Sequence, residues 1–215
     1  MVKFVGLGGG IGAGKSTVGT ALAKRGAVII DVDRLSREIQ RPGSPVFDAI
    51  VDRWGPAVVG PDGQLDRPAL GRIVFADSAE LAVLTNEITA PAISRAIVER
   101  ASAHLGTTTV VVLESASLLG GPRRLYGLEG LIAVDVPTEI ALTRLVERRG
   151  MTEDDARARI GKQRTREERL AAADFVIDNS GDHAALAPRL DQAWTWIRGL
   201  PDATPTLDGA DWATG

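Results

Sequence analysis

Short apolar runs alternate along this chain with longer segments of helical periodicity. The runs are rich in Val and Ile and mostly continuous, which is typical of strands covered by helices on both faces. The pattern therefore predicts an α/β fold with a parallel sheet. The expected strands are Val2–Leu7, Ala27–Ile30, Thr108–Leu113, Leu131–Val136 and Asp174–Ile177.

The interval between the second and third expected strands lacks a convincing strand of its own. Ser44 followed by Pro45 is an N-cap before a proline at the first helical position, which opens a helix. Because several such helices follow one another, we expect residues 34–105 to form an inserted region that covers a substrate. The expected helices run from Pro45 to about Trp54, from Asp66 through Phe75, from Ser78 to about Thr89 and from Pro91 to His104.

Two further segments complete the expected organisation. Residues 144–169 are rich in arginine, and Thr152 followed by three carboxylates predicts a helix start within them, so we expect a helical lid. A last helix is expected over 182–199, and residues 200–215 have the composition of a flexible tail. The nucleotide-binding core would then comprise residues 1–33, 106–143 and 170–199.

The composition narrows the possible chemistry. The chain has 215 residues, 44% of them hydrophobic and 25% charged, which is typical of a globular protein. It contains no cysteine, so disulfides, zinc fingers, iron–sulfur clusters and thiol catalysis are excluded. Its two histidines, His104 and His183, make a histidine-rich metal site or a Ser-His-Asp triad improbable.

Charge and hydropathy bound the possible partners. The net charge of −3 gives no reason to expect nucleic acid as a partner. No apolar run approaches the roughly 20 residues that span a bilayer, and the N-terminus lacks the pattern of a signal peptide. We therefore expect no membrane partner and a cytoplasmic protein.

A glycine-rich loop follows the first expected strand and precedes a helix that would begin near Lys15. It fits the pattern G-x-x-x-x-G-K-[ST], whose glycines let backbone N–H groups surround phosphate oxygens. Lys15 would bridge the β- and γ-phosphates, and the Ser16 hydroxyl would ligate Mg²⁺. The expected nucleotide-binding residues of this loop are Gly10, Ile11, Gly12, Ala13, Gly14, Lys15, Ser16 and Thr17.

The N-K-x-D motif that GTPases use for guanine is absent. The only two asparagines, Asn86 and Asn179, are followed by Glu87 and Ser180. Large motor ATPases need a far longer chain. The sequence therefore favours a kinase that acts on a small molecule or a nucleotide.

A pair of carboxylates closes the second expected strand. In strand geometry Asp31 and Asp33 would lie on one face, near the sheet edge where α/β proteins bind ligands. A kinase acting on an alcohol needs a carboxylate that accepts the hydroxyl proton, and we expect Asp33 to be that base. The alternative is that Asp31 and Asp33 merely cap the following helix.

These residues, with others along the chain, resemble the dephospho-coenzyme A kinase family. The resemblance covers about residues 4 to 180. It rests on Gly6-Leu7-x-Gly9-Gly10-Ile11-Gly12-x-Gly14-Lys15-Ser16, Asp31-x-Asp33, Arg37-Glu38, Gly63-x-Leu65-Asp66-Arg67-x-x-Leu70-Gly71-x-Ile73-Val74-Phe75, Arg144-Leu145-x-x-Arg148, Ala156-x-x-Arg159-Ile160-x-x-Gln163 and Ala173-Asp174-Phe175-Val176-Ile177-x-Asn179.

The resemblance implies a P-loop kinase with a five-stranded parallel sheet in the order 2-3-1-4-5. It implies transfer of the γ-phosphate of ATP to the ribose 3′-hydroxyl of dephospho-coenzyme A, giving coenzyme A. The family's catalytic aspartate falls on Asp33. The family's helical substrate region and lid fall on 34–105 and 144–169.

Departures from the family pattern gather on the acceptor side. The family usually has Thr where Gly8 stands, His where Ala90 stands and Pro-Leu-Leu-Phe-Glu over Ala116–Gly120. Arg149 replaces a frequent aspartate. These changes leave open a kinase of the same architecture with another hydroxyl acceptor, or a non-catalytic nucleotide-binding regulator.

Arginines of the lid and two strand-end residues complete the candidate site. Arg144 and Arg148 share one helix face, and Arg148 is the expected phosphate clamp, whereas solvated surface ion pairs are the alternative. Glu114 would hold a magnesium-bound water, or be an ordinary strand-end acid. Asn179 would contact adenine, or serve a turn. We expect ATP and Mg²⁺ as cofactors, and a monomer or small homo-oligomer.

Overall fold

The computed structural model describes residues 2–121 and 125–207, and its centre is a five-stranded parallel sheet in the order β2-β3-β1-β4-β5. The fold class and strand order expected from the sequence are therefore confirmed. Each strand begins and ends within two residues of its expected bounds, because the ends of a continuous apolar run are easy to locate in a sequence. The strands are β1 (Lys3–Gly9), β2 (Val28–Asp31), β3 (Val110–Glu114), β4 (Gly130–Asp135) and β5 (Phe175–Asp178).

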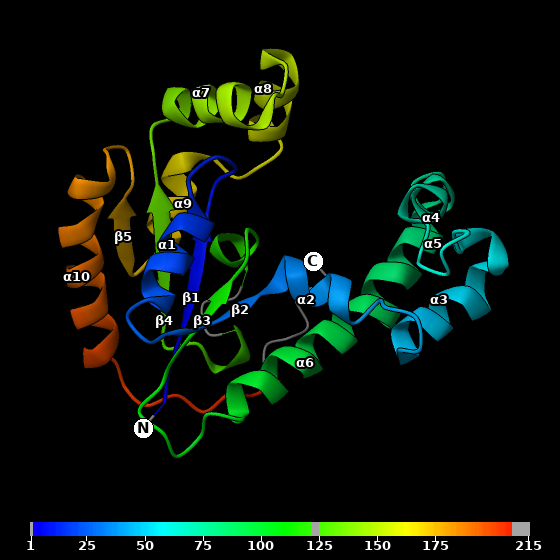
Figure 1. The fold of residues 1–215 in the computed structure, drawn as a ribbon, viewed down its shortest axis with the longest axis horizontal. Helices are drawn as coiled ribbons and strands as arrows, with labels where there is room; N and C mark the ends of the chain where they lie inside the picture. The colour runs from blue at the N-terminus through cyan, green and yellow to red at the C-terminus, as the bar shows by residue number, and fades with distance from the viewer. Residues whose placement is uncertain (1, 122–124, 208–215) are drawn as a thin grey trace.

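Helices cover both faces of this sheet (Figure 1). Helices α1 (Lys15–Ala23) and α10 (His183–Gly199) pack on one face, where the buried side chains of Leu22 and Ile197 meet Val5 and Val112 of the strands. Helices α2 (Val32–Glu38), α6 (Ala90–Ser102) and α9 (Arg166–Ala172) pack on the other face with two 3₁₀ turns, η3 (Leu118–Gly120) and η4 (Leu125–Gly127). The parallel strands are thus shielded from water on both sides, as their sequence requires.

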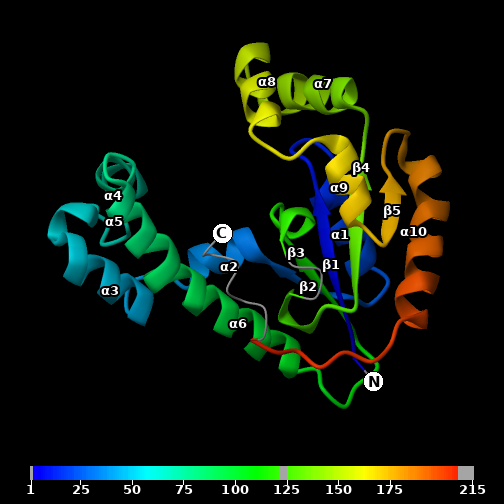
Figure 2. The ribbon, with the colours of Figure 1, turned by 180° about the vertical axis from the view of Figure 1, so that it is seen from behind.

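The stretch between β2 and β3 is helical, as predicted, and it extends away from the sheet (Figures 1 and 2). Helix α3 (Pro45–Trp54) begins where Ser44 caps it, and helix α4 (Arg67–Val74) begins where Asp66 caps it. A 3₁₀ turn, η1 (Pro56–Val58), and helix α5 (Ser78–Ala82) complete this arm. The arm has a small hydrophobic core of its own, formed by Val46, Ile50, Val58, Leu70 and Val74.

Two helices predicted to be separate form one continuous helix. Helix α5, capped by Asp77 rather than Ser78, runs through a π-helical segment η2 (Val83–Thr89) directly into α6. The Thr89 hydroxyl donates to the carbonyl of Leu84 at 2.8 Å. Pro91 was expected to start a helix because it lacks an N–H and clashes with the preceding turn. The wider π turn before Pro91 accommodates its ring, so the helix continues.

The lid segment stands beyond the carboxyl ends of the strands (Figures 1 and 2). It consists of α7 (Thr138–Arg149), which starts before the expected lid boundary, and α8 (Glu153–Gly161), which Thr152 caps as predicted. Buried Leu142, Leu145 and Ala156 join these two helices, and Ile11 of the glycine-rich loop packs against them. The lid therefore has an apolar contact with the loop beneath it.

The segment after α10 differs from the expected flexible tail. Over residues 200–207 the chain crosses the base of the sheet, where the N–H of Ala203 donates to the carbonyl of Val2 at 3.0 Å. Lys3 and Asp202 form an ion pair at 2.9 Å, and Ala203 is buried. These contacts hold residues 200–207 against the sheet and join positions about 200 residues apart, which no local pattern indicates. Residues 208–215 lie outside the described residues.

Within the described part of the chain, no helix is long and apolar enough to cross a membrane.

Candidate active site

The glycine-rich loop leaves β1 and enters α1 at Lys15. Gly12 and Gly14 have φ of +80° and +92°, which side chains rarely tolerate. A Cβ at Gly12 would lie 2.8 Å from the carbonyl oxygen of Ala141, and one at Gly14 would lie 2.3 Å from Nδ2 of Asn179. Both glycines are therefore required for the loop to fit beneath α7 and beside Asn179.

Lys15 lies at the loop's inner side, where its ammonium donates to the carbonyl of Gly9 at 3.0 Å. Burial lowers the pKa of Lys15, while the negative charges of Glu114 and Asp33 oppose that effect. Because Lys15 is partly desolvated, a bound anion would stabilise its charged form. The position predicted for a phosphate-binding lysine thus has the matching electrostatics.

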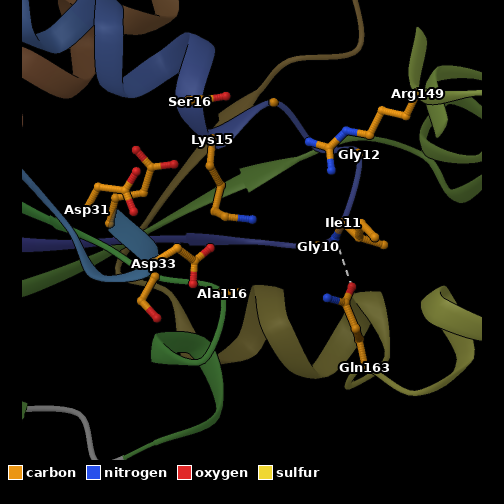
Figure 3. A pocket seen from close by; sticks show the side chains of 13 residues that line it. Gly10, Ile11, Gly12, Lys15, Ser16, Asp31, Asp33, Ala116, Arg149 and Gln163 are labelled. Atoms are coloured by element: carbon orange, nitrogen blue, oxygen red, sulfur yellow. Dashed lines mark hydrogen bonds between the residues drawn. The ribbon is translucent and has the colours of Figure 1, made fainter. Parts of the chain in front are cut away.

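Three carboxylates line one cavity of about 380 Å³ together with Lys15, and Figure 3 shows those of Asp31 and Asp33 near the Lys15 side chain. They come from Asp31, Asp33 and Glu114, at the carboxyl ends of neighbouring strands β2 and β3. Burial raises the pKa of Glu114, and the negative charges of Asp31 and Asp33 raise it further. The cavity therefore has a cationic wall and an acidic wall. Its lining comprises Gly10, Ile11, Gly12, Gly14, Lys15, Ser16, Asp31, Asp33, Glu114, Ser115, Ala116, Arg149 and Gln163.

The reason given for pairing Asp31 with Asp33 is wrong, although both residues reach the cavity. Strand β2 ends at Asp31 and α2 begins at Val32, so strand periodicity does not apply. Asp31 accepts the N–H of Arg34 at 3.1 Å and caps α2, which is the alternative weighed for it. Asp33 lies in the first turn of α2 with its exposed side chain in the cavity.

Ser16 and Glu114, the residues expected at a metal ion, are compatible with one but do not form a complete set of ligands by themselves. Among the described residues, no group of three or more His, Cys, Asp or Glu side chains could hold a metal ion. Ser16 and Glu114 nevertheless line the same cavity, and mutually repelling carboxylates attract a divalent cation. Mg²⁺ commonly takes one or two protein ligands and completes its shell with water and phosphate oxygens.

A second cavity of about 370 Å³ lies on the lid side of the loop. Arg144, Arg148 and Asn179 line it together with Ser16 and Thr17. Asn179 is buried and donates Nδ2–H to the carbonyl of Ala13 at 2.8 Å. Arg144 donates to the carbonyl of Asn179 at 2.8 Å. The structure thus brings these predicted residues together and gives Asn179 a bracing contact with the loop, while its adenine contact stays a prediction.

Several residues in and beside the site were not predicted to be functional. Arg149, noted only as a departure, lines both cavities. The guanidinium of Arg166 forms a bidentate ion pair with Asp135 at the end of β4, with a closest distance of 2.5 Å. Asp135 ends a strand as Glu114 does, so its place in the sequence could have indicated a residue beside the site. Arg169 lies against Gly10, and nothing local in the sequence indicates this.

Two departures from the family pattern contact each other beneath the loop. Gly8 of β1 faces Leu119, whose Cγ would lie only 2.5 Å from a Cβ at position 8. The buried Leu119 side chain thus fills the space that a residue-8 side chain would need. A side chain at position 8 would therefore have to displace Leu119.

Comparison with known proteins decides the family. A family model described as dephospho-CoA kinase matches residues 3–185. The chain belongs to the dephospho-CoA kinase family. The dephospho-CoA kinase of Streptomyces avermitilis is 48% identical over 192 residues, covering 88% of this chain and 91% of that protein. The dephospho-CoA kinase of Leifsonia xyli is 40% identical over 200 residues, covering 92% and 100%.

Solved structures agree with this dephospho-CoA kinase fold. The protein TT1252 of Thermus thermophilus has a TM-score of 0.73 at 30% identity, over 90% of this chain and 97% of that one. The dephospho-CoA kinase of Campylobacter jejuni has a TM-score of 0.64 at 23% identity, over 92% and 98%. The resemblance stated from the motifs and the assignment as a kinase are therefore confirmed.

Proposed function

We propose that this chain transfers the γ-phosphate of ATP to the ribose 3′-hydroxyl of dephospho-coenzyme A, giving coenzyme A and ADP. One observation supports this most directly: Lys15 of the phosphate loop and the carboxylate of Asp33 line the same cavity from two sides. Phosphoryl transfer needs this arrangement, with the phosphate held on one side and the attacking hydroxyl on the other.

The loop supplies the donor half of the reaction. Backbone N–H groups of the loop other than that of Ile11, which donates to Gln163, surround the ATP phosphates, and Lys15 exchanges the Gly9 carbonyl for β- and γ-phosphate oxygens. The Ser16 hydroxyl would hold Mg²⁺ directly, and Glu114 would hold one of its water ligands. The ion's contribution is to neutralise charge on the phosphates.

Asp33 supplies the acceptor half. Its carboxylate accepts the proton of the 3′-hydroxyl as the oxygen attacks the γ-phosphorus. Because it lies in the first turn of α2 rather than in the strand, its backbone is fixed by the Asp31 cap. Residues 34–105 would cover the rest of the acceptor.

The lid arginines stabilise the charge that develops on the transferred group. Arg148 is exposed in the second cavity and is free to move with α7, which suits a clamp that closes over ATP. Arg144 is already held by the carbonyl of Asn179, so it steadies the loop and the nucleotide. Closure of the lid helices α7 and α8 would exclude water from the transferring phosphoryl group.

The test is ADP release from ATP measured against a panel of alcohol acceptors that includes dephospho-coenzyme A. With wild-type protein we expect turnover only with dephospho-coenzyme A. The variant Asp33→Asn should lower kcat by about 10²–10⁴-fold, the usual contribution of a general base, with little change in ATP affinity. Asp191→Asn is the control, since Asp191 is an exposed acid on α10 that lines neither cavity.

Two results would overturn the proposal. Turnover with a different alcohol and none with dephospho-coenzyme A would mean that the acceptor is wrong. ATP binding without ADP release for any acceptor would favour the nucleotide-binding regulator.

A further inference from the structure

Gln163 connects the end of the lid to the phosphate loop. It lies between α8 and α9 and is half-buried, and its Oε1 accepts the N–H of Ile11 at 2.9 Å (Figure 3). Gly10 lies beside this bond: a Cβ there would be in ordinary contact with Oε1 of Gln163 at 3.4 Å and would approach the guanidinium of Arg169 to 2.9 Å.

The hydrogen bond from Ile11 fixes the orientation of the Gln163 amide. A backbone N–H can only donate, so the carbonyl oxygen of the side chain must face the loop and the NH₂ group must face away. Figure 3 shows the Gln163 nitrogen turned away from Ile11 and toward the part of the cavity lined by Lys15 and Asp33. Among the described residues, no acceptor is hydrogen-bonded to Nε2 of Gln163. The NH₂ group of Gln163 is therefore available as a donor on the wall of the reaction cavity.

The surroundings favour a neutral donor at this place. Arg149 and Arg169 already lower the pKa of Lys15 through their positive charges. A further cation would lower it more and weaken the charged form of Lys15 that phosphate needs. An amide supplies hydrogen bonds without adding charge.

We propose that Gln163 is a catalytic residue whose Nε2 donates hydrogen bonds to the equatorial oxygens of the phosphoryl group during its transfer. The inference rests on the proposed function, which places that group between Lys15 and Asp33. Charge spreads over those oxygens in the transition state, and a preoriented donor stabilises it without reorganising. Since Gln163 follows the lid directly in the chain, the donor reaches the cavity only when this end of the lid is docked on Ile11.

Two variants separate the donor from the docking contact. Gln163→Glu keeps an oxygen for the Ile11 N–H and replaces the NH₂ donor by an oxygen, whereas Gln163→Met removes both and adds no charge. Because the donor is lost in both, kcat for coenzyme A formation should fall about 10²–10³-fold in both, as for loss of one oxyanion donor. The Michaelis constant for ATP should change by less than about threefold in Gln163→Glu. The same two changes at Gln192, exposed on α10 and away from the cavities, should leave kcat unaltered.

The possible results decide between three roles. A normal kcat in both variants would overturn the inference. So would a raised Michaelis constant for ATP and a lower melting temperature in Gln163→Met alone, which indicate a docking contact only. A lower Michaelis constant for ATP with unchanged kcat would mean that Gln163 competes with nucleotide for the loop. If wild-type protein forms no coenzyme A, the proposed function fails instead, and that is seen before any variant is made.

Discussion

The packing of Leu119 against Gly8 allows a stability prediction with a defined magnitude. A Cβ at Gly8 would lie 2.5 Å from Cγ and 2.9 Å from Cδ1 of Leu119, which is only 2% exposed. Gly8→Ala must therefore displace Leu119 or bend β1, and overpacking of this kind costs about 1–3 kcal/mol. Replacing glycine within a strand also stabilises the protein by about 0.5–1 kcal/mol, because the unfolded chain then has less conformational entropy to lose. Together the two effects allow a net loss of unfolding free energy of about 0–2.5 kcal/mol, and the severe 2.5 Å approach favours about 1–2 kcal/mol.

Urea unfolding followed by circular dichroism measures this loss, which corresponds to a fall in Tm of about 2–8 °C for a chain of this size. Gly199→Ala is the control. Gly199 is the exposed last residue of α10, and a Cβ there meets no atom within 4 Å. Its replacement should leave stability unchanged or slightly raised.

A double-mutant cycle identifies the clashing partner. Leu119→Ala alone should cost about 2–5 kcal/mol, as a large-to-small change in a core does. In the Leu119→Ala background, Gly8→Ala should no longer destabilise, which gives a coupling energy of about 1–2 kcal/mol. An equal cost of Gly8→Ala in both backgrounds, or no cost in either, would refute the reasoning.

Three further predictions concern the pKa of Glu114, the ion pair of Arg166 with Asp135, and the buried Ala203. The pKa of Glu114 is raised above its ordinary 4.5, so its contribution to stability is present below that pH and is lost as pH rises through the raised value. Thermal unfolding should therefore find Glu114→Gln more stable than wild type at pH 8 and equal to it at pH 4. Arg166→Met leaves the carboxylate of Asp135, which is 11% exposed, without its partner. Urea titration should show a loss of unfolding free energy of about 2–3 kcal/mol, less than for a fully buried pair because Arg166 is 38% exposed. The loss should be smaller in the Asp135→Asn background, where no carboxylate charge is left unpaired. Ala203→Asp buries an unpaired charge at the base of the sheet and should lower Tm while leaving the Michaelis constant for ATP unchanged in the folded protein.

The elements that the sequence predicted well are those with a local cause. The caps at Ser44, Asp66 and Thr152 each accept an N–H from the first turn of the helix that follows, and these three helices begin where expected. The loop before Lys15 was equally readable, because its glycines meet a steric requirement that few other residues satisfy. Local patterns therefore sufficed for the strands, most helices and the phosphate loop.

Predictions were wrong where two local signals competed. Strand periodicity and helix capping both applied near Asp31, and the cap prevailed because its side chain binds the N–H of Arg34. At Pro91 a helix-breaking residue was offset by the π turn before it. In both places the residue types indicated two possible structures, and the sequence alone did not show which of the two would form.

Contacts between distant segments could not be predicted from local pattern. The bond from Ile11 to Gln163 joins residues 152 positions apart, and the ion pair of Asp135 with Arg166 joins two elements across the lid. The family motif pointed to Gln163 without indicating its partner. Such contacts depend on how the lid returns to the sheet, which only the fold determines.

The helical arm has a consequence for how this architecture can vary. It leaves the sheet after β2 and returns at β3, and these two strands are hydrogen-bonded neighbours. Its outer helices bury their own apolar side chains, so a longer, shorter or reoriented arm leaves the pairing of the strands intact. Exchanging only the outer helices between α2 and α6 would retain β3, the phosphate loop, Asp33 and Glu114 while presenting a different molecule to them.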